Sequence, residues 1–190
     1  MKELNPNKFQ SPIPIIFKLK SILLGKSNPD IYTQINFIIN ILIWMIFMFW
    51  NIMSYFIITL RSLIFQYKGI PVEKIIEKRG VELGFASNDF LSRLLTFHSI
   101  AIICWILVLF GLIILYRKKK NFSLFILGGA GFYVGMSIFY LNWNYFITDT
   151  TSFDKIALLI LITSTTIHIF ITKNERLGNS INFFGENLED

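Results

Sequence analysis

Four long stretches without a formal charge constrain the fold of this chain more than any other feature. Charged residues are absent between Asp30 and Arg61, between Arg93 and Arg117, and throughout 121–148. A shorter uncharged stretch covers 156–172. A helix that crosses a bilayer needs about 20 mostly apolar residues, so the fourth stretch lies near the lower limit. The sequence predicts an all-α integral membrane protein with four transmembrane helices, at about 35–60, 94–116, 122–141 and 155–172.

Composition excludes the soluble alternative. The chain has 190 residues, of which 54% are hydrophobic and only 16% charged, whereas soluble domains carry about 25% charged residues. One such stretch could be a buried core helix, but four leave too little polar sequence to cover them. We therefore expect a membrane domain over 31–172, preceded by a cytoplasmic segment 1–30 and followed by a cytoplasmic tail 173–190.

Basic residues predict the orientation, because cytoplasmic loops are enriched in Lys and Arg. Five lysines lie within residues 1–30, and the second connection carries four consecutive basic residues, whereas the third carries Asp149 and Asp154. This pattern places both termini in the cytoplasm of a bacterial inner membrane. The first connection, 61–93, then faces outward, and its six basic residues weigh against this orientation. The residues expected to set topology or touch lipid headgroups are Lys18, Lys20, Lys26, Arg117, Lys118, Lys119 and Lys120.

Two segments outside the spans have amphipathic helical spacing. Residues 13–24 follow two prolines and combine apolar positions with lysines, which predicts a helix on the cytoplasmic surface or against a partner. In the outer connection, Pro71 can begin a helix whose Ile75, Ile76 and Arg79 share one face. We expect this second helix to rest on the outer interface or on a partner.

The third span contains a stripe of small residues. Gly128, Gly131 and Gly135 are spaced by three and four residues, so they share one helix face, and Asn142 extends the stripe. Membrane helices approach closely where both partners present small residues. The stripe is therefore predicted to be a helix-packing face.

The first and fourth spans carry polar stripes. Asn36, Asn40, Asn51 and Ser54 fall within an arc of about 60° on a helix. On the fourth span, Ser164 and His168 are four residues apart. Amide groups at this depth need hydrogen-bond partners rather than acyl chains, so both stripes are predicted to contact other helices, of this chain or of another.

Several chemical functions lack the residues that they need. The spans contain no Asp or Glu and no Lys or Arg at mid-depth, which argues against an ion-driven motor or a voltage sensor built from this chain alone. Cys104 is the sole cysteine, and His98 and His168 are expected near opposite membrane faces, so no metal or haem site is predicted. Neither cofactors nor nucleic acid are expected as partners, because the basic residues flank membrane spans.

These observations favour an accessory or scaffolding subunit of a membrane complex, with no catalysis of its own and with lipids and other membrane subunits as partners. The first alternative is a small transporter or channel component, which needs a water-filled path lined by Asn36, Asn40, Asn51 and Ser164. The second is an enzyme of lipid or envelope metabolism, which needs a cleft shared by Asp149, Asp154 and His98.

Overall fold

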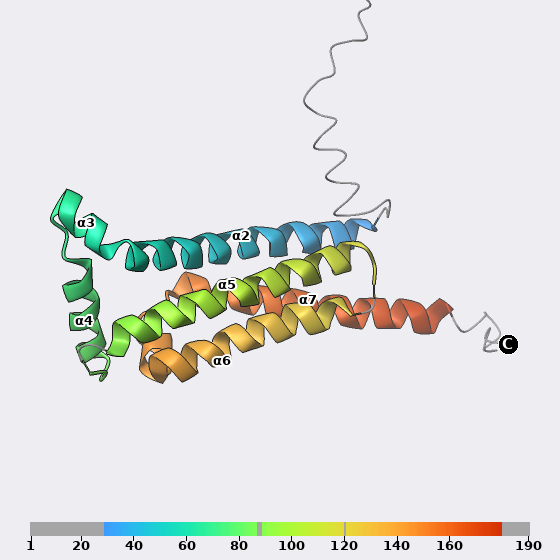
Figure 1. Ribbon diagram of the computed structural model, residues 1–190. Coiled ribbons are helices and arrows are strands. Elements are labelled where there is room, and N and C mark those ends of the chain that lie inside the picture. The colour runs from blue at the N-terminus through green and yellow to red at the C-terminus, as the bar shows by residue number, and fades with distance from the viewer. Residues whose placement is uncertain (1–28, 87–88, 120, 180–190) are drawn as a thin grey trace, which may run out of the picture.

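Four long helices lie side by side and form a bundle (Figure 1). The computed structural model describes residues 29–86, 89–119 and 121–179, with 173–179 described by their backbone alone. Its helices are α2 (Ile31–Thr59), α3 (Arg61–Lys68), α4 (Val72–Glu82), α5 (Asp89–Tyr116), α6 (Phe122–Thr148) and α7 (Ser152–Asn179). The described residues contain no strand.

The fold class predicted from the sequence is confirmed at the level of the spans. Helices α2, α5 and α6 contain 29, 28 and 27 residues, and the apolar part of α7 contains 21, so each is long enough to cross a membrane. The helices begin slightly earlier than predicted, α5 at Asp89 and α7 at Ser152. The predicted N-terminal helix 13–24, with Lys18, Lys20 and nearby Lys26, lies outside the described residues, as does Lys120.

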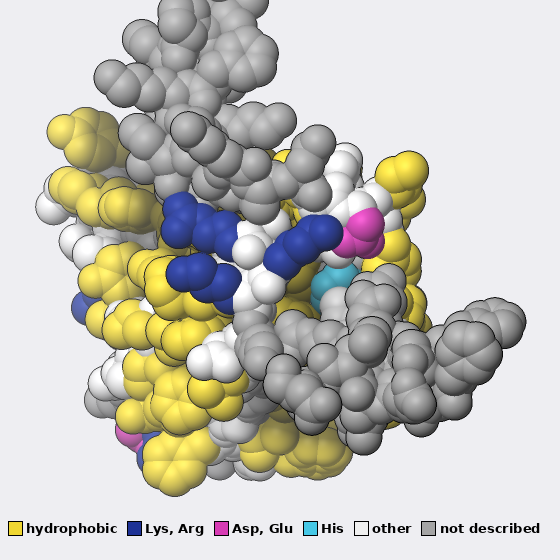
Figure 2. All heavy atoms as spheres, turned by 90° about the vertical axis from the view of Figure 1, so that its right-hand side faces the viewer, with side chains coloured by type: hydrophobic (Ala, Val, Ile, Leu, Met, Phe, Trp, Pro, Cys, Tyr) yellow, Lys and Arg dark blue, Asp and Glu magenta, His cyan; other side chains and the backbone are white. Residues whose placement is uncertain are grey.

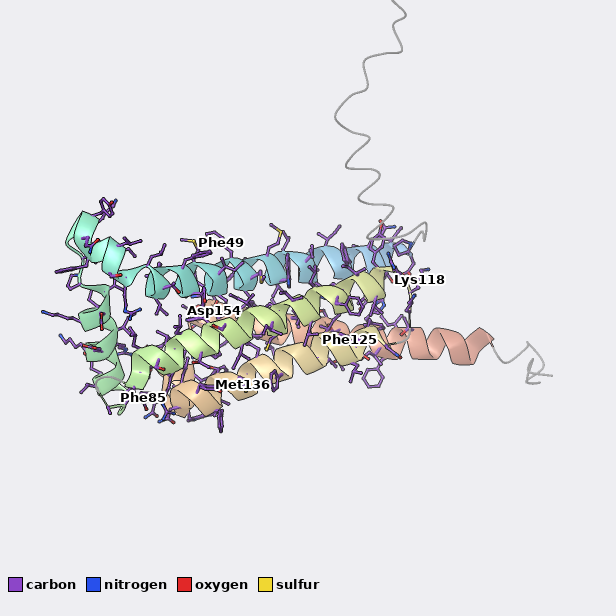
Figure 3. All side chains as sticks on the ribbon, viewed as in Figure 1. Phe49, Phe85, Lys118, Phe125, Met136 and Asp154 are labelled. Atoms are coloured by element: carbon purple, nitrogen blue, oxygen red, sulfur yellow. The ribbon has the colours of Figure 1, made fainter. Side chains whose placement is uncertain are left out.

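The bundle has two different ends, which we name after residues that lie there. At the Arg79 end, α4 crosses the end of the bundle, and Phe85 lies between α4 and α5 (Figure 3). At the Lys118 end, α2 begins and α5 connects to α6 (Figure 1). Figure 2 shows Lys and Arg side chains gathered at this second end, where Arg117, Lys118 and Lys119 follow α5.

The outward surface of the bundle is apolar. Along α2, Ile38, Leu42, Met45 and Phe49 recur at helical spacing and are each more than half exposed, and Phe49 points away from the other helices (Figure 3). The buried face of the same helix carries asparagines. A helix in water has the opposite distribution, so this arrangement fits a protein whose surroundings are lipid.

Helix α5 is the centre of the bundle, and glycines allow it to approach α6 closely. Trp105, Val108 and Leu112 of α5 are completely buried. A Cβ atom on Gly111 would lie 2.9 Å from the backbone nitrogen of Ile126, and one on Gly129 would lie 2.8 Å from Cγ2 of Val108. The close contact within this chain is therefore made by Gly111 and Gly129.

The glycines singled out in the sequence lie elsewhere on α6. Gly128, Gly131 and Gly135 are exposed, and a Cβ atom on any of them would meet no atom within 4 Å among the described residues. Their face therefore contacts no other helix of the described chain. That it packs against a partner stays a prediction.

Candidate functional site

The polar stripe of α2 divides into two clusters, and the first is closed within the protein. Asn36 donates from Nδ2 to the backbone oxygen of Ser164 at 2.9 Å, and Asn40 donates to Oδ1 of Asn36 at 2.8 Å. The Ser164 hydroxyl donates to Oδ1 of Asn40 at 3.0 Å. Both asparagines are buried. This closed cluster joins α2 to α7 near the Lys118 end.

His168 continues the same contact between α7 and α2. It is buried, and its ring stacks on Tyr32 with 5.4 Å between the ring centroids. Phe122 of α6 meets the same imidazole edge-on at 5.3 Å. His168 therefore lies in an aromatic contact at the Lys118 end, far along the bundle from His98.

The second cluster pairs Asn51 of α2 with His98 of α5. Nδ2 of Asn51 donates to the backbone oxygen of Phe47 at 2.8 Å, and Oδ1 of Asn51 lies 2.9 Å from Nδ1 of His98. A backbone carbonyl can only accept, so it fixes the orientation of the amide. Oδ1 therefore faces the histidine and needs a donor there. In a neutral ring this places the proton on Nδ1 and leaves Nε2 as an acceptor.

A pocket of about 500 Å³ opens beside this pair at the Arg79 end. We call it the roofed pocket. Its roof is α4 with the Arg79–Asp149 ion pair, and its floor is the side that His98 lines. Ile57, Ile75, Ile76 and Leu94 supply much of its apolar wall. Its complete lining is Trp50, Ser54, Ile57, Ile58, Ile75, Ile76, Arg79, Phe90, Leu94, His98, Tyr145 and Asp149.

The roof is anchored by an ion pair between elements that are distant in the sequence. Nε of Arg79 on α4 lies 3.1 Å from both carboxylate oxygens of Asp149, and Nη2 also contacts Asp149. Nη1 donates to Glu82 at 2.6 Å. The hydrogen bonds with Asp149, and then with Glu82, raise the pKa of the Arg79 guanidinium further above its usual value. The roof charge is therefore compensated by two carboxylates.

Close backbone packing holds α4 at the same place. Gly80 is buried against Phe90 of α5, and a Cβ atom there would lie 2.4 Å from Cβ of Phe90. Any larger residue would push α4 away from α5. The glycine and the ion pair together fix α4 across the bundle end.

A break in α6 brings the last two lining residues to the pocket. Asn142 has φ 70° and ψ 158°, which is not helical, and its side chain accepts from the Trp143 amide at 2.6 Å. This combination lies outside the left-handed helical region that asparagine favours and is rarely adopted by residues other than glycine. Beyond this break, Tyr145 packs near Phe90, with 6.3 Å between the ring centroids, and Asp149 follows. The predicted end of the third span, at 141, coincides with the break.

The cleft expected for an enzyme is only partly present. His98 and Asp149 line the roofed pocket, but Asp154 does not belong to its lining. Instead, Asp154 accepts from the hydroxyl of Thr151 at 2.7 Å, while its own amide donates back to that hydroxyl at 3.1 Å. Such a reciprocal bond is typical of a residue that starts a helix. Asp154 therefore lies in the first turn of α7, where it holds the capping residue Thr151.

A second charged group forms at the Lys118 end. Asp30 caps α2 by accepting from the Thr33 amide at 3.0 Å and from the Thr33 hydroxyl at 2.8 Å, and Lys118 lies 3.4 Å away. Burial alone would raise the pKa of Asp30, but the hydrogen bonds with Thr33 outweigh it and hold that pKa at about 2. This group connects the start of α2 to the end of α5.

Sequence reasoning singled out residues at the roofed pocket without predicting a pocket, because it assigned them to helix-packing or interface faces. It placed Asn51 and Ser54 on one face and Ile75, Ile76 and Arg79 on another, and each group lies at the pocket or beside it. It missed Trp50 and Tyr145, which carry no sequence signal that separates them from ordinary aromatic residues of a span. The pairing of Arg79 with Asp149 was also missed, because it spans 70 residues.

The described residues contain no group of three His, Cys, Asp or Glu side chains arranged to hold a metal ion. The roofed pocket is an open, largely apolar groove, and its polar groups are the His98 imidazole and the Arg79–Asp149 ion pair. Comparisons with protein-family models, with curated proteins and with solved structures found no match to this chain.

Proposed function

We propose that this chain is a multi-pass membrane protein that binds an amphipathic membrane molecule in the roofed pocket. The observation that carries the proposal is the pocket lining, in which Trp50, Ile57 and Leu94 form apolar walls and His98 and Arg79 supply separate polar ends. Ligand sites are typically concave, mostly apolar and furnished with a few placed polar groups. A lipid-like molecule has the same division into chain and head.

The proposal includes a location. With both termini in the cytoplasm of a bacterial inner membrane, the Arg79 end faces outward and the pocket lies in the outer leaflet. Helix α4, with its Ile75 and Val81 side chains exposed, then lies at the outer membrane interface. The basic residues Arg117, Lys118 and Lys119 at the other end support this orientation through the positive-inside rule.

The test is retention of lipid by the purified protein. Ser54 lines the pocket, so Ser54→Trp would fill it, whereas Thr163→Trp places the same bulk on an exposed position of α7. Native mass spectrometry should detect a bound lipid on the wild type and on Thr163→Trp, and a strongly reduced amount on Ser54→Trp. Equal retention by all three proteins would contradict the proposal.

An accessory role within a membrane complex is a second proposal, and one observation favours it. The exposed Gly128, Gly131 and Gly135 leave a face on α6 that none of the described residues covers. Gly131→Leu should fold normally, because nothing lies near its Cβ position. Co-purification in mild detergent should recover a defined partner with the wild type and lose it with Gly131→Leu. A wild-type protein that purifies as a clean monomer would count against this role.

The channel hypothesis receives less support from the same geometry. Asn36, Asn40 and Ser164 are hydrogen-bonded to one another, and both asparagines are buried. Polar groups that satisfy each other in this way do not line a water path. The enzyme hypothesis keeps two of its three residues in the pocket, but Asp154 serves the start of α7.

A further inference from the structure

The acceptor at the floor of the roofed pocket defines what kind of head group can bind there. Nδ1 of His98 is hydrogen-bonded to Oδ1 of Asn51, so Nε2 is the ring nitrogen that can bind a ligand. His98 is 5% exposed and lines the pocket. Among the described residues, no side chain donates a hydrogen bond to Nε2. An acceptor that receives no hydrogen bond from the protein can accept one from a ligand in the pocket, so a ligand that donates at this point gains affinity.

Charge compensation at the roof makes an anionic head group a poor match. Arg79 already binds Asp149 through several hydrogen bonds and also binds Glu82. The two carboxylates neutralise the charge of Arg79, which weakens its attraction for an anionic head group. Nε2 of His98 is therefore an uncharged acceptor in the pocket to which a neutral head group can donate.

The depth of His98 supports the same conclusion. Arg93 and Asp89 form an exposed ion pair on the first turns of α5, at 2.6 Å. His98 follows Arg93 by five positions, which places it roughly 7 Å deeper along the helix at 1.5 Å per residue. A charged group is strongly disfavoured below the level of the headgroups, whereas an uncharged hydroxyl is tolerated once it has a partner.

We propose that the ligand of the roofed pocket is an uncharged long-chain lipid with a free hydroxyl, which donates a hydrogen bond to Nε2 of His98. This inference rests on the proposed function, that the pocket binds a membrane amphiphile. The apolar chain lies against Trp50, Ile57 and Leu94. An ether or an ester at the same position would place an acceptor against an acceptor, so the pocket discriminates in favour of the alcohol.

Trp50 gives a direct measurement, because bromine atoms quench tryptophan emission only at short range. The probe is 9,10-dibromooctadecan-1-ol, and its methyl ether is the matched compound without the donor. Each is titrated into the full chain in lipid nanodiscs, and the Trp50 contribution is obtained by subtracting the signal of Trp50→Phe. The alcohol should quench saturably at a concentration about five- to tenfold lower than the ether.

Three variants test whether Nε2 of His98 is the atom responsible for the preference for the alcohol over the ether. His98→Phe should give the alcohol and the ether the same half-saturation concentration. Ser54→Ala and Tyr145→Phe remove the other hydroxyls that line the pocket and should keep the preference for the alcohol. Because the two compounds are first compared on the wild type, with Trp50→Phe as the fluorescence blank, this comparison does not depend on the folding of His98→Phe, Ser54→Ala or Tyr145→Phe.

Failure of the two proposals is distinguishable. If neither compound quenches saturably, the proposed function fails. If both bind the wild type equally, or the ether binds more tightly, the pocket binds amphiphiles but the hydroxyl inference is overturned. A preference that persists in His98→Phe also overturns it, since another group would then accept the hydrogen bond.

Discussion

The two halves of this bundle use the same kind of polar residue in opposite ways. Toward the Lys118 end, Asn36 and Asn40 meet Ser164, and their hydrogen bonds close on each other without an opening. Toward the Arg79 end, Asn51 meets His98, and that pair leaves one acceptor beside a pocket. A buried asparagine in a membrane helix is therefore no evidence of a site by itself; what matters is whether its network is complete.

Packing differs between the halves in the same direction. Gly111 allows α5 and α6 to approach closely toward the Lys118 end. At the Arg79 end, α4 crosses the bundle (Figure 1), and the pocket is lined by residues of α2, α4, α5 and the end of α6. A tightly packed half supplies stability and a more open half holds a cavity, and the following experiments test this division.

The largest effect is expected from Gly111→Ala. The added Cβ would lie 2.7 Å from Cγ1 of Ile126 and 2.9 Å from its backbone nitrogen, which cannot move independently of α6. We expect a loss of about 2–3 kcal/mol in the free energy of unfolding, measured by titration of the micellar protein with a denaturing detergent. The control is Gly128→Ala on the open face of α6, which should leave the free energy unchanged or slightly raise it. Equal effects would show that close approach at Gly111 does not stabilise this half.

A smaller effect is expected from breaking the closed cluster. Asn40→Ala removes the hydrogen bonds to Asn36 and from Ser164. Because hydrogen bonds between membrane helices contribute modestly, we expect a loss of about 1–2 kcal/mol in the same unfolding assay. Lipid retention should not change, since this cluster is not part of the pocket. A loss of bound lipid in Asn40→Ala would contradict the separation of the two halves.

Loosening the roof should act locally rather than on the whole fold. In Asp149→Asn, Arg79 loses its charged partner on the α6–α7 connection, so amide hydrogen exchange across α4 should become faster while exchange in α5 stays the same. Glu82→Gln is the matched control, because it removes a partner that lies on α4 itself. If both variants leave α4 exchange unchanged, the ion pair does not anchor the roof.

The smallest effect concerns Asp30 at the Lys118 end. Its folded pKa of about 2 lies below its ordinary value of 3.8, so its ionised form stabilises the fold above about pH 4. That contribution is lost as the pH falls toward 2. Asn also caps helices well, so Asp30→Asn should cost about 0.3–1 kcal/mol at neutral pH. Thermal unfolding of both proteins between pH 7 and pH 2 should show this difference shrinking to zero, and a constant difference would argue against the charge.

Sequence reasoning recovered the features that depend on local pattern. Uncharged length identified the four helices, and helical spacing placed Asn36 and Asn40 on a buried face. It did not identify the packing glycines, because Gly128 and Gly129 are neighbours and only the position of α5 decides which one is covered. The pocket could not be predicted for the same reason. Its walls come from separate segments, and a local sequence pattern does not show how those segments are placed relative to one another.

The Arg79–Asp149 pair has a consequence for the order in which the protein is made. Its two members are separated by 70 positions, and two whole membrane helices, α5 and α6, are synthesised between them. While the ribosome is still producing α5, the arginine has no Asp149 to bind, and α4 lacks that attachment. The roof is therefore completed only after the segment following α6 has reached the same side of the bilayer. The pocket becomes available late in insertion, when nearly the whole membrane domain is in place.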